Sequence, residues 1–96
     1  MQERYIEKKV CAFAKANGWT HRKLQWIGRS GAPDRVFIKN GRVIFVEFKQ
    51  LGKKPSPNQK IEISVLREAG AEVHVCDDIE TGKRILSSFR NTSDLI

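Results

Sequence analysis

Apolar residues recur at helical spacing in three parts of the chain. Between residues 2 and 17 they fall on one face of a helix that should end at Gly18. A second helix is expected to begin at Pro57, because Ser56 before it is a favourable N-cap. A third helix is expected after residues 77–80, which resemble a capping box. The apolar faces of these helices are predicted to contain Ile6, Val10, Phe13 and Ala14 in the first, Ile61, Val65, Leu66 and Ala69 in the second, and Ile85, Leu86 and Phe89 in the third.

Four segments between these helices have the short apolar pattern of strands, at residues 19–26, 34–38, 42–49 and 73–76. Asn40-Gly41 is a strong hairpin signal, so the second and third strands should be antiparallel. The helix that begins at Pro57 should connect the third and fourth strands by a crossover, which makes them parallel. Residues 43–46 are all apolar, which is typical of a central strand covered on both faces. The expected fold class is therefore α/β, with a mixed central β-sheet flanked by helices.

A chain of 96 residues has room for one domain, which we expect over residues 1–90, followed by a polar tail over residues 91–96. The composition, with 40% hydrophobic and 30% charged residues, is that of a folded protein rather than a disordered one. The longest apolar run is far shorter than the roughly 18 residues of a membrane helix. The first residues lack the apolar core of a secretory signal. The expected location is the cytoplasm.

The chain is strongly basic, with eighteen Lys and Arg residues against eleven Asp and Glu and a net charge of +7. The usual partner of such a field is the phosphate backbone of a nucleic acid. The alternative is charge that only keeps the protein in solution. Cys11 and Cys76 form neither a CxxC motif nor a cluster with histidine, which indicates buried, reduced thiols rather than a zinc site. His21 and His74 are isolated, and Trp19 and Trp26 are expected in the core or at an interface.

The candidate chemistry lies at one end of the predicted hairpin. Asp34 begins the second strand, and Glu47 and Lys49 lie near the end of the third. Because the two strands are antiparallel around Asn40-Gly41, Asp34 should lie beside Glu47. Glu47 and Lys49 are two residues apart in a strand, so their side chains should point to the same face. Two carboxylates and one ammonium group are therefore expected to converge.

This set of side chains suits the hydrolysis of a phosphodiester bond. Two close carboxylates repel each other unless a cation lies between them, and Mg²⁺ prefers a few carboxylate oxygens together with water and phosphate oxygens. A bound metal ion lowers the pKa of a coordinated water, and a neighbouring lysine can stabilise developing negative charge. The backbone carbonyl of Phe48 is a possible further ligand. The alternative is an ion pair on the strand surface between Glu47 and Lys49, with Asp34 as an ordinary loop residue.

Pro33-Asp34 followed by Glu47-Phe48-Lys49 resembles the motif of PD-(D/E)xK nucleases. The wider pattern is similar to the virus-type replication-repair nuclease domain, VRR-NUC, in the small stand-alone form found in phages and prophages. The resemblance extends over about residues 3–78. The stretches that carry it are Ile6-Glu7-Lys8-Lys9, Gly31-Ala32-Pro33-Asp34-Arg35, Val46-Glu47-Phe48-Lys49, Gly52-Lys53-Lys54-Pro55 and Gln59.

The resemblance implies a restriction-endonuclease-like core and a DNA endonuclease that depends on Mg²⁺ or Mn²⁺. Asp34 and Glu47 would bind the metal, Lys49 would be the catalytic lysine, and Gln59 would support the active site. Small stand-alone members of this kind resemble Holliday-junction resolvases and act as homodimers. Such a protein would act on branched DNA in the cytoplasm of a bacterial host and needs no nucleotide cofactor.

An additional acid from the first helix is common in this superfamily, and Glu7 and Glu3 are the candidates here. Both lie close to the apolar face of the predicted helix, where a carboxylate needs a reason such as a metal site. The alternative is that both are first-turn acids favoured by the helix dipole. We expect Glu7 rather than Glu3 as the possible additional metal ligand. The alternative for Gln59 is an exposed polar residue in the first turn of its helix.

A basic loop follows the third strand directly, and its position suggests contacts to the phosphates beside the cut site. A solvated loop is the alternative. The residues expected to bind DNA are Lys53, Lys54, Arg29 and Arg35.

The sequence thus predicts a metal-dependent endonuclease for branched DNA, as a homodimeric Holliday-junction resolvase. One alternative is a monomeric nuclease directed to flaps or nicks. The other is a DNA-binding module without catalytic activity.

Overall fold

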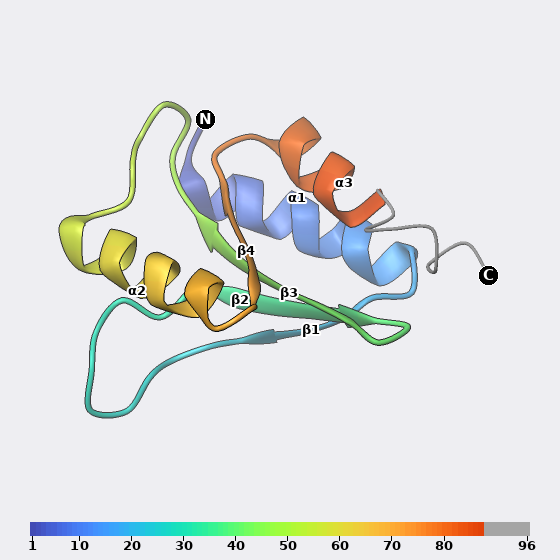
Figure 1. Ribbon diagram of the computed structural model, residues 1–96. Coiled ribbons are helices and arrows are strands. Elements are labelled where there is room, and N and C mark those ends of the chain that lie inside the picture. The colour runs from blue at the N-terminus through green and yellow to red at the C-terminus, as the bar shows by residue number, and fades with distance from the viewer. Residues whose placement is uncertain (88–96) are drawn as a thin grey trace.

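The computed structural model describes residues 1–87, which form one mixed α/β unit (Figure 1). Residues 88–96, including the predicted tail and Phe89, lie outside the described residues. The elements follow the order α1 (Glu3–Ala16), β1 (Thr20–Lys23), β2 (Arg35–Lys39), β3 (Arg42–Phe48), α2 (Pro57–Glu68), β4 (Glu72–Cys76) and α3 (Ile79–Ser87). All three predicted helices are present.

The four strands form a single sheet in the order β1-β2-β3-β4. β1 pairs with β2 and β2 with β3 in antiparallel fashion, whereas β3 and β4 are parallel. Lys39 faces Arg42 across the two-residue hairpin loop, where Asn40 and Gly41 both have positive φ, at 49° and 80°. This is the backbone that Asn-Gly favours. The predicted mixed sheet, hairpin and crossover are therefore confirmed.

The helices cover the two faces of the sheet unequally. α1 and α3 lie on one face and α2 lies on the other (Figure 1). The core forms between α1 and the inward side chains of β2, β3 and β4, and its buried members include Ile6, Val10, Ala14, Phe37, Ile44, Val46, Phe48 and Cys76. α3 approaches α1 closely because Gly82 has no side chain, and a Cβ there would lie 2.5 Å from Val10 Cγ2.

Two expectations about strand cover and strand length are wrong in part. β1 is shorter than residues 19–26, because Trp19 packs into the core before the strand begins and the chain leaves the sheet after Lys23. β3 is fully covered on one face only. Ile44 and Val46 are buried against α1, but Val43 on the other face is 39% exposed.

The predicted apolar face of α2 is also wrong in part, because, of its members, only Leu66 is half-buried. Ile61 and Val65 are 60% and 48% exposed, whereas Glu62 and Ile63 are buried. The side of α2 that faces the protein combines the buried Ile63 with polar contacts, since Gln59 and Glu62 both bind partners in other elements. The apolar spacing of α2 therefore marks its outer side.

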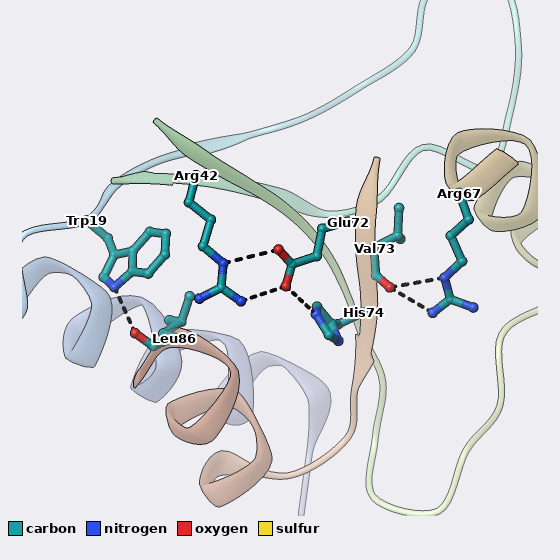
Figure 2. A network of polar contacts seen from close by, with 7 residues as sticks. All are labelled: Trp19, Arg42, Arg67, Glu72, Val73, His74 and Leu86. Carbon is teal, nitrogen blue, oxygen red and sulfur yellow. Dashed lines mark hydrogen bonds and ion pairs between the residues drawn. The ribbon is translucent and has the colours of Figure 1, made fainter. Parts of the chain in front are cut away.

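A polar network fastens β4 to its surroundings (Figure 2). Arg42 donates two hydrogen bonds to Glu72, at 3.1 and 2.7 Å, and His74 Nε2 lies 2.8 Å from the same carboxylate. The Arg67 guanidinium of α2 donates to the carbonyl oxygen of Val73. These contacts hold the edge strand that completes the sheet.

The two cysteines are free and buried, as expected, and burial raises the pKa of both thiols. Over residues 1–87, no helix is long and apolar enough to cross a membrane.

Candidate active site

The hairpin brings Asp34 and Glu47 to the same end of the sheet. Arg35 and Val46 are the last paired residues of β2 and β3, and Asp34 and Glu47 are the next residue on each side. The Phe48 N–H donates a hydrogen bond of 2.8 Å to Asp34 Oδ2. This bond continues the strand pairing through a side chain and fixes the Asp34 carboxylate against the backbone of β3.

Glu47 is a buried carboxylate, with 2% of its surface exposed. Its Oε2 atom accepts a hydrogen bond of 2.7 Å from Gln59 Nε2 and lies 3.3 Å from Lys49 Nζ. Its Oε1 atom is buried and has no hydrogen-bond partner among the described residues. The pair of Glu47 and Lys49 is thus an inward ion pair and not one on the strand surface.

The electrostatics of the two carboxylates reflect their closeness. Burial and the charge of Asp34 raise the pKa of Glu47 to about 7, against the opposing effect of Lys49. Burial also raises the pKa of Asp34, although the hydrogen bond from the Phe48 N–H acts to lower it. Burial is thus the main cause of both raised pKa values, and the charge of Lys49 opposes it at both carboxylates.

The donor atoms fit a divalent cation. The unpartnered Oε1 of Glu47 is a buried acceptor that needs a positive partner. Asp34 and Glu47 supply two carboxylates, which matches the way Mg²⁺ binds through one or two carboxylates while it keeps several waters. Among residues 1–87, no group of three or more His, Cys, Asp or Glu side chains is arranged as a ready metal site. Any ion here would therefore depend on water, backbone or substrate oxygens for its remaining ligands.

Gln59 connects α2 to Glu47 and completes the N-terminal cap of the helix. Ser56 Oγ accepts from the Gln59 N–H, and Gln59 Oε1 accepts from the Ser56 N–H at 2.9 Å. The amide nitrogen of the same side chain donates to Glu47. One amide thus satisfies the helix end with its oxygen and orients the buried carboxylate with its nitrogen.

The acids of α1 lie close to the two carboxylates, but Glu7 is already paired. Glu7 Oε2 accepts a hydrogen bond of 2.7 Å from Arg35 Nε and lies 3.5 Å from Lys23 Nζ. The charge of Glu7 nevertheless acts to raise the pKa of Asp34, and that of Glu3 acts on Glu47 in the same direction. Both acids also line a cleft of about 850 Å³ with Arg35 and Gln50, the residues that follow Asp34 and Lys49 in the chain. A metal-binding role for Glu7 stays a prediction.

Comparison with known proteins shows the family of the chain. The sequence model of the VRR-NUC domain matches residues 8–78, a stretch that contains Asp34, Glu47, Lys49 and Gln59. The chain belongs to the VRR-NUC family. It is 40% identical over 78 residues to "Putative nuclease p44" of Acyrthosiphon pisum secondary endosymbiont phage 1, which covers 80% of this chain and 84% of that protein. A solved VRR-NUC domain superposes with a TM-score of 0.83 and 32% identity, over 91% of this chain and 96% of the other.

The family and the phage relative identify the chain as a VRR-NUC nuclease, so DNA is its expected substrate. The predicted family resemblance and the mixed α/β fold are therefore confirmed. The sheet and its flanking helices are compatible with a restriction-endonuclease-like core.

The basic residues predicted to bind DNA divide into two groups in this VRR-NUC domain. Lys53 and Lys54 are exposed in the loop between β3 and α2. Arg29 and Arg35 both form ion pairs with carboxylates, Arg29 with Glu62 at 3.2 Å and Arg35 with Glu7. Arg29 remains 63% exposed, whereas only 22% of the Arg35 side chain is exposed. Arg35 thus has a structural partner that its sequence position did not reveal.

Sequence reasoning missed Glu62, a buried acid on α2. Its carboxylate accepts a hydrogen bond of 2.6 Å from Trp26 Nε1 and pairs with Arg29. The available signal was its position three residues after Gln59, which places both side chains on one face of α2. The apolar spacing of Ile61 and Val65 instead predicted that the opposite face of α2 is buried.

Proposed function

We propose that this VRR-NUC protein is a Mg²⁺- or Mn²⁺-dependent DNA endonuclease that cuts branched DNA, as a homodimeric Holliday-junction resolvase. The observation that carries the metal dependence is the unpartnered, buried Oε1 of Glu47 beside Asp34. A buried carboxylate oxygen without a hydrogen-bond donor costs stability. Such an arrangement is typical of a site built for a ligand.

Asp34 and Glu47 would hold the cation, and the backbone carbonyl of Phe48 between Glu47 and Lys49 is a further candidate ligand. A divalent ion bound there would supply Lewis acidity and a coordinated water of lowered pKa. Glu7 is the candidate for an additional ligand, but it would have to loosen its hydrogen bond to Arg35.

The protein's own groups would orient the reaction. The water oxygen would form a bond to phosphorus in line with the P–O3′ bond, which would break. The attacking water would release a proton to solvent, and the leaving 3′-oxygen would take up a proton from solvent. The Lys49 ammonium, beside Glu47, would stabilise negative charge on the attacked phosphate and orient the water. The Phe48 N–H and the Gln59 amide would keep the two carboxylates in place during the step.

The basic surface would bind the DNA backbone. Lys53 and Lys54 follow Lys49 on an exposed loop, so their charges reach phosphates on either side of the cut. Arg29 keeps most of its side chain in solvent and could contact phosphate while it stays paired to Glu62.

Exposed apolar side chains on the α2 side of the sheet favour a dimer. Ile38 and Val43 face each other across β2 and β3 and are 41% and 39% exposed. Ile61 and Val65 lie on the outer side of α2. A small protein gains stability by burying such a surface, and a two-fold dimer would present two active sites to a two-fold junction.

The experiment is cleavage of a labelled four-way junction, with flap and linear duplex as comparison substrates. Each would be incubated with Mg²⁺, Mn²⁺ or EDTA, and with Lys49→Ala and the exposed control Lys15→Ala in parallel. We expect paired, symmetric cuts in either metal, none in EDTA, and about a 10²–10³-fold loss in Lys49→Ala only. Cutting of flaps alone would show that the protein is a monomeric structure-specific nuclease and not a resolvase. Salt-sensitive DNA binding without cutting would leave a non-catalytic module.

A further inference from the structure

The segment between β1 and β2 leaves the sheet and docks on α2 before it returns at Asp34. Figure 1 shows this long connection beside α2. Trp26 Nε1 donates a hydrogen bond of 2.6 Å to Glu62 Oε2, and Arg29 Nη2 lies 3.2 Å from Glu62 Oε1. One carboxylate of α2 thus holds two side chains of this segment, residues 24–33, which we name the docking segment.

The backbone of the docking segment also touches α2 directly. Gly31 has φ +93°, and a Cβ there would lie 2.9 Å from the Asn58 carbonyl oxygen and 3.2 Å from Glu62 Cβ. Ser30 Oγ accepts a weak hydrogen bond of 3.4 Å from Asn58 Nδ2. Only glycine allows so close an approach with this backbone. The approach lies three residues before Asp34.

Glu62 is a costly choice for a contact whose only purpose is stability. It is 5% exposed, and a buried carboxylate is tolerated only when it is paired. An apolar side chain of similar volume often stabilises a fold as well as a buried ion pair does. What the carboxylate adds is a directional contact, because the indole N–H donates to Glu62 Oε2 in few orientations, while Arg29 is held by charge and makes no hydrogen bond to Oε1.

The same end of α2 orients the other carboxylate of the site. Gln59, one turn before Glu62, donates to Glu47. Asp34 follows the docking segment directly, after the buried Pro33. α2 therefore contacts Glu47 through Gln59 and, through Glu62, the segment that leads into Asp34, whose carbonyl oxygen also accepts a hydrogen bond from the Leu24 N–H.

We propose that Glu62 is a positioning residue: by holding Trp26 and Arg29 it fixes the docking segment on α2 and so sets the placement of Asp34 relative to Glu47. This proposal rests on the proposed metal-dependent function. Residues that orient metal ligands from outside typically change metal affinity by 10–100-fold when they are replaced. Since Glu62 acts through the backbone, we expect an effect near the lower end of that range.

The test measures Mn²⁺ binding by electron paramagnetic resonance in the absence of DNA, together with thermal unfolding. Glu62→Ala is compared with Glu68→Gln, which removes an exposed acid from the same helix. Trp26→Phe keeps an aromatic side chain but removes the N–H donor together with part of the ring, and it serves as the second variant if Glu62→Ala fails to fold. Wild type and Glu68→Gln should bind Mn²⁺ equally. The dissociation constant should rise about tenfold in Glu62→Ala and severalfold in Trp26→Phe.

DNA cleavage gives the second readout. Excess Mn²⁺ should restore the kcat of Glu62→Ala, which a general loss of folding would not produce. Unchanged Mn²⁺ affinity in a folded Glu62→Ala or Trp26→Phe protein would overturn the positioning role and leave the nuclease function intact. A wild-type protein that neither binds Mn²⁺ nor cuts DNA would overturn the proposed function, and the positioning role with it.

Discussion

At the residue scale, the amide of Gln59 combines two tasks. Its oxygen caps α2 by accepting from Ser56 N–H, and its nitrogen donates to the buried Glu47. A carboxylate could accept but could not donate while ionised. The hydrogen bonds of the amide oxygen and of the amide nitrogen together explain why glutamine stands at this position.

This dual role predicts the effect of Gln59→Glu. The capping oxygen remains, so the helix cap should be kept, but a second carboxylate beside the buried Glu47 should lower the melting temperature. The donor to Glu47 is replaced by a second negative group, and cleavage should fall by about 10–100-fold. Gln59→Ala should in addition lose the capping box and about 1 kcal/mol of stability. The measurement is kcat at saturating metal beside a thermal melt. Gln59→Glu activity equal to wild type would show that the hydrogen bond to Glu47 has no role in the reaction.

The residues of the candidate site differ in how visible they are in the sequence. Asp34, Glu47 and Lys49 could be placed together because a two-residue hairpin fixes the register and strand periodicity fixes the face. Glu7 could be placed near the site, but its pairing with Arg35 depends on how α1 crosses β2. Contacts between elements far apart in the chain are set by packing and do not follow from local spacing.

At the element scale, α2 shows why apolar spacing alone can mislead. Ile61 and Val65 recur at helical spacing, yet Glu62 and Ile63 face the protein. The bonds from Gln59 to Glu47 and from Trp26 to Glu62 decide the rotation of this helix. The existence and bounds of α2 were predictable from Ser56 and Pro57, whereas its orientation required knowledge of its polar partners.

The edge strand β4 predicts a pH-dependent contribution to stability. Burial acts to raise the pKa of Glu72, but hydrogen bonds from Arg42 and His74 outweigh it and lower the pKa below the ordinary value of 4.5. A lowered pKa means that the folded state binds the proton less tightly than the unfolded state. The stabilisation is therefore complete above pH 4.5 and is lost as the pH falls through the folded pKa.

Glu72→Gln should accordingly lower the free energy of unfolding by about 1–3 kcal/mol at pH 7. The difference from wild type should shrink as the pH falls below 4.5. Denaturant unfolding at a series of pH values checks this, with Glu68→Gln as the exposed control. A difference that stays constant down to pH 3 would contradict the assignment of the stabilisation to the ionised Glu72.

The packing of α3 on α1 predicts a second effect on stability. Alanine at position 82 would place a Cβ 2.5 Å from Val10 Cγ2 and 3.1 Å from Cys76 Sγ. The two helices would have to move apart, at a cost of about 1–3 kcal/mol. Gly82→Ala should therefore lower the melting temperature, although alanine favours helix formation. Val10→Ala removes the methyl groups that the new Cβ would meet, so the stability loss of the double variant should be smaller than the sum of the two single losses. Losses that simply add would show that the strain of Gly82→Ala lies elsewhere.

At the scale of the whole molecule, the two faces of the sheet have different exposure. α1 and α3 bury one face completely enough to form the core, whereas α2 leaves Ile38 and Val43 partly open on the other. The site lies at one end of β2 and β3, and these exposed residues lie toward the hairpin end. A partner seated on the open face would therefore leave the site accessible to DNA.

The proposed dimer predicts that a charge on this face separates the subunits. Val65→Glu changes a residue that is 48% exposed, so the fold of the single chain should be nearly unaffected. Light scattering should give twice the 11.0 kDa chain mass for wild type and the single mass for Val65→Glu. Tyr5→Glu, at a 49% exposed position of α1 on the opposite face, should stay dimeric. With the dimer lost, the second cut in a four-way junction should no longer accompany the first, while single cuts in Mg²⁺ continue. Wild-type protein that is monomeric at the assay concentration and still makes paired cuts would overturn the dimer and leave the active site as it is.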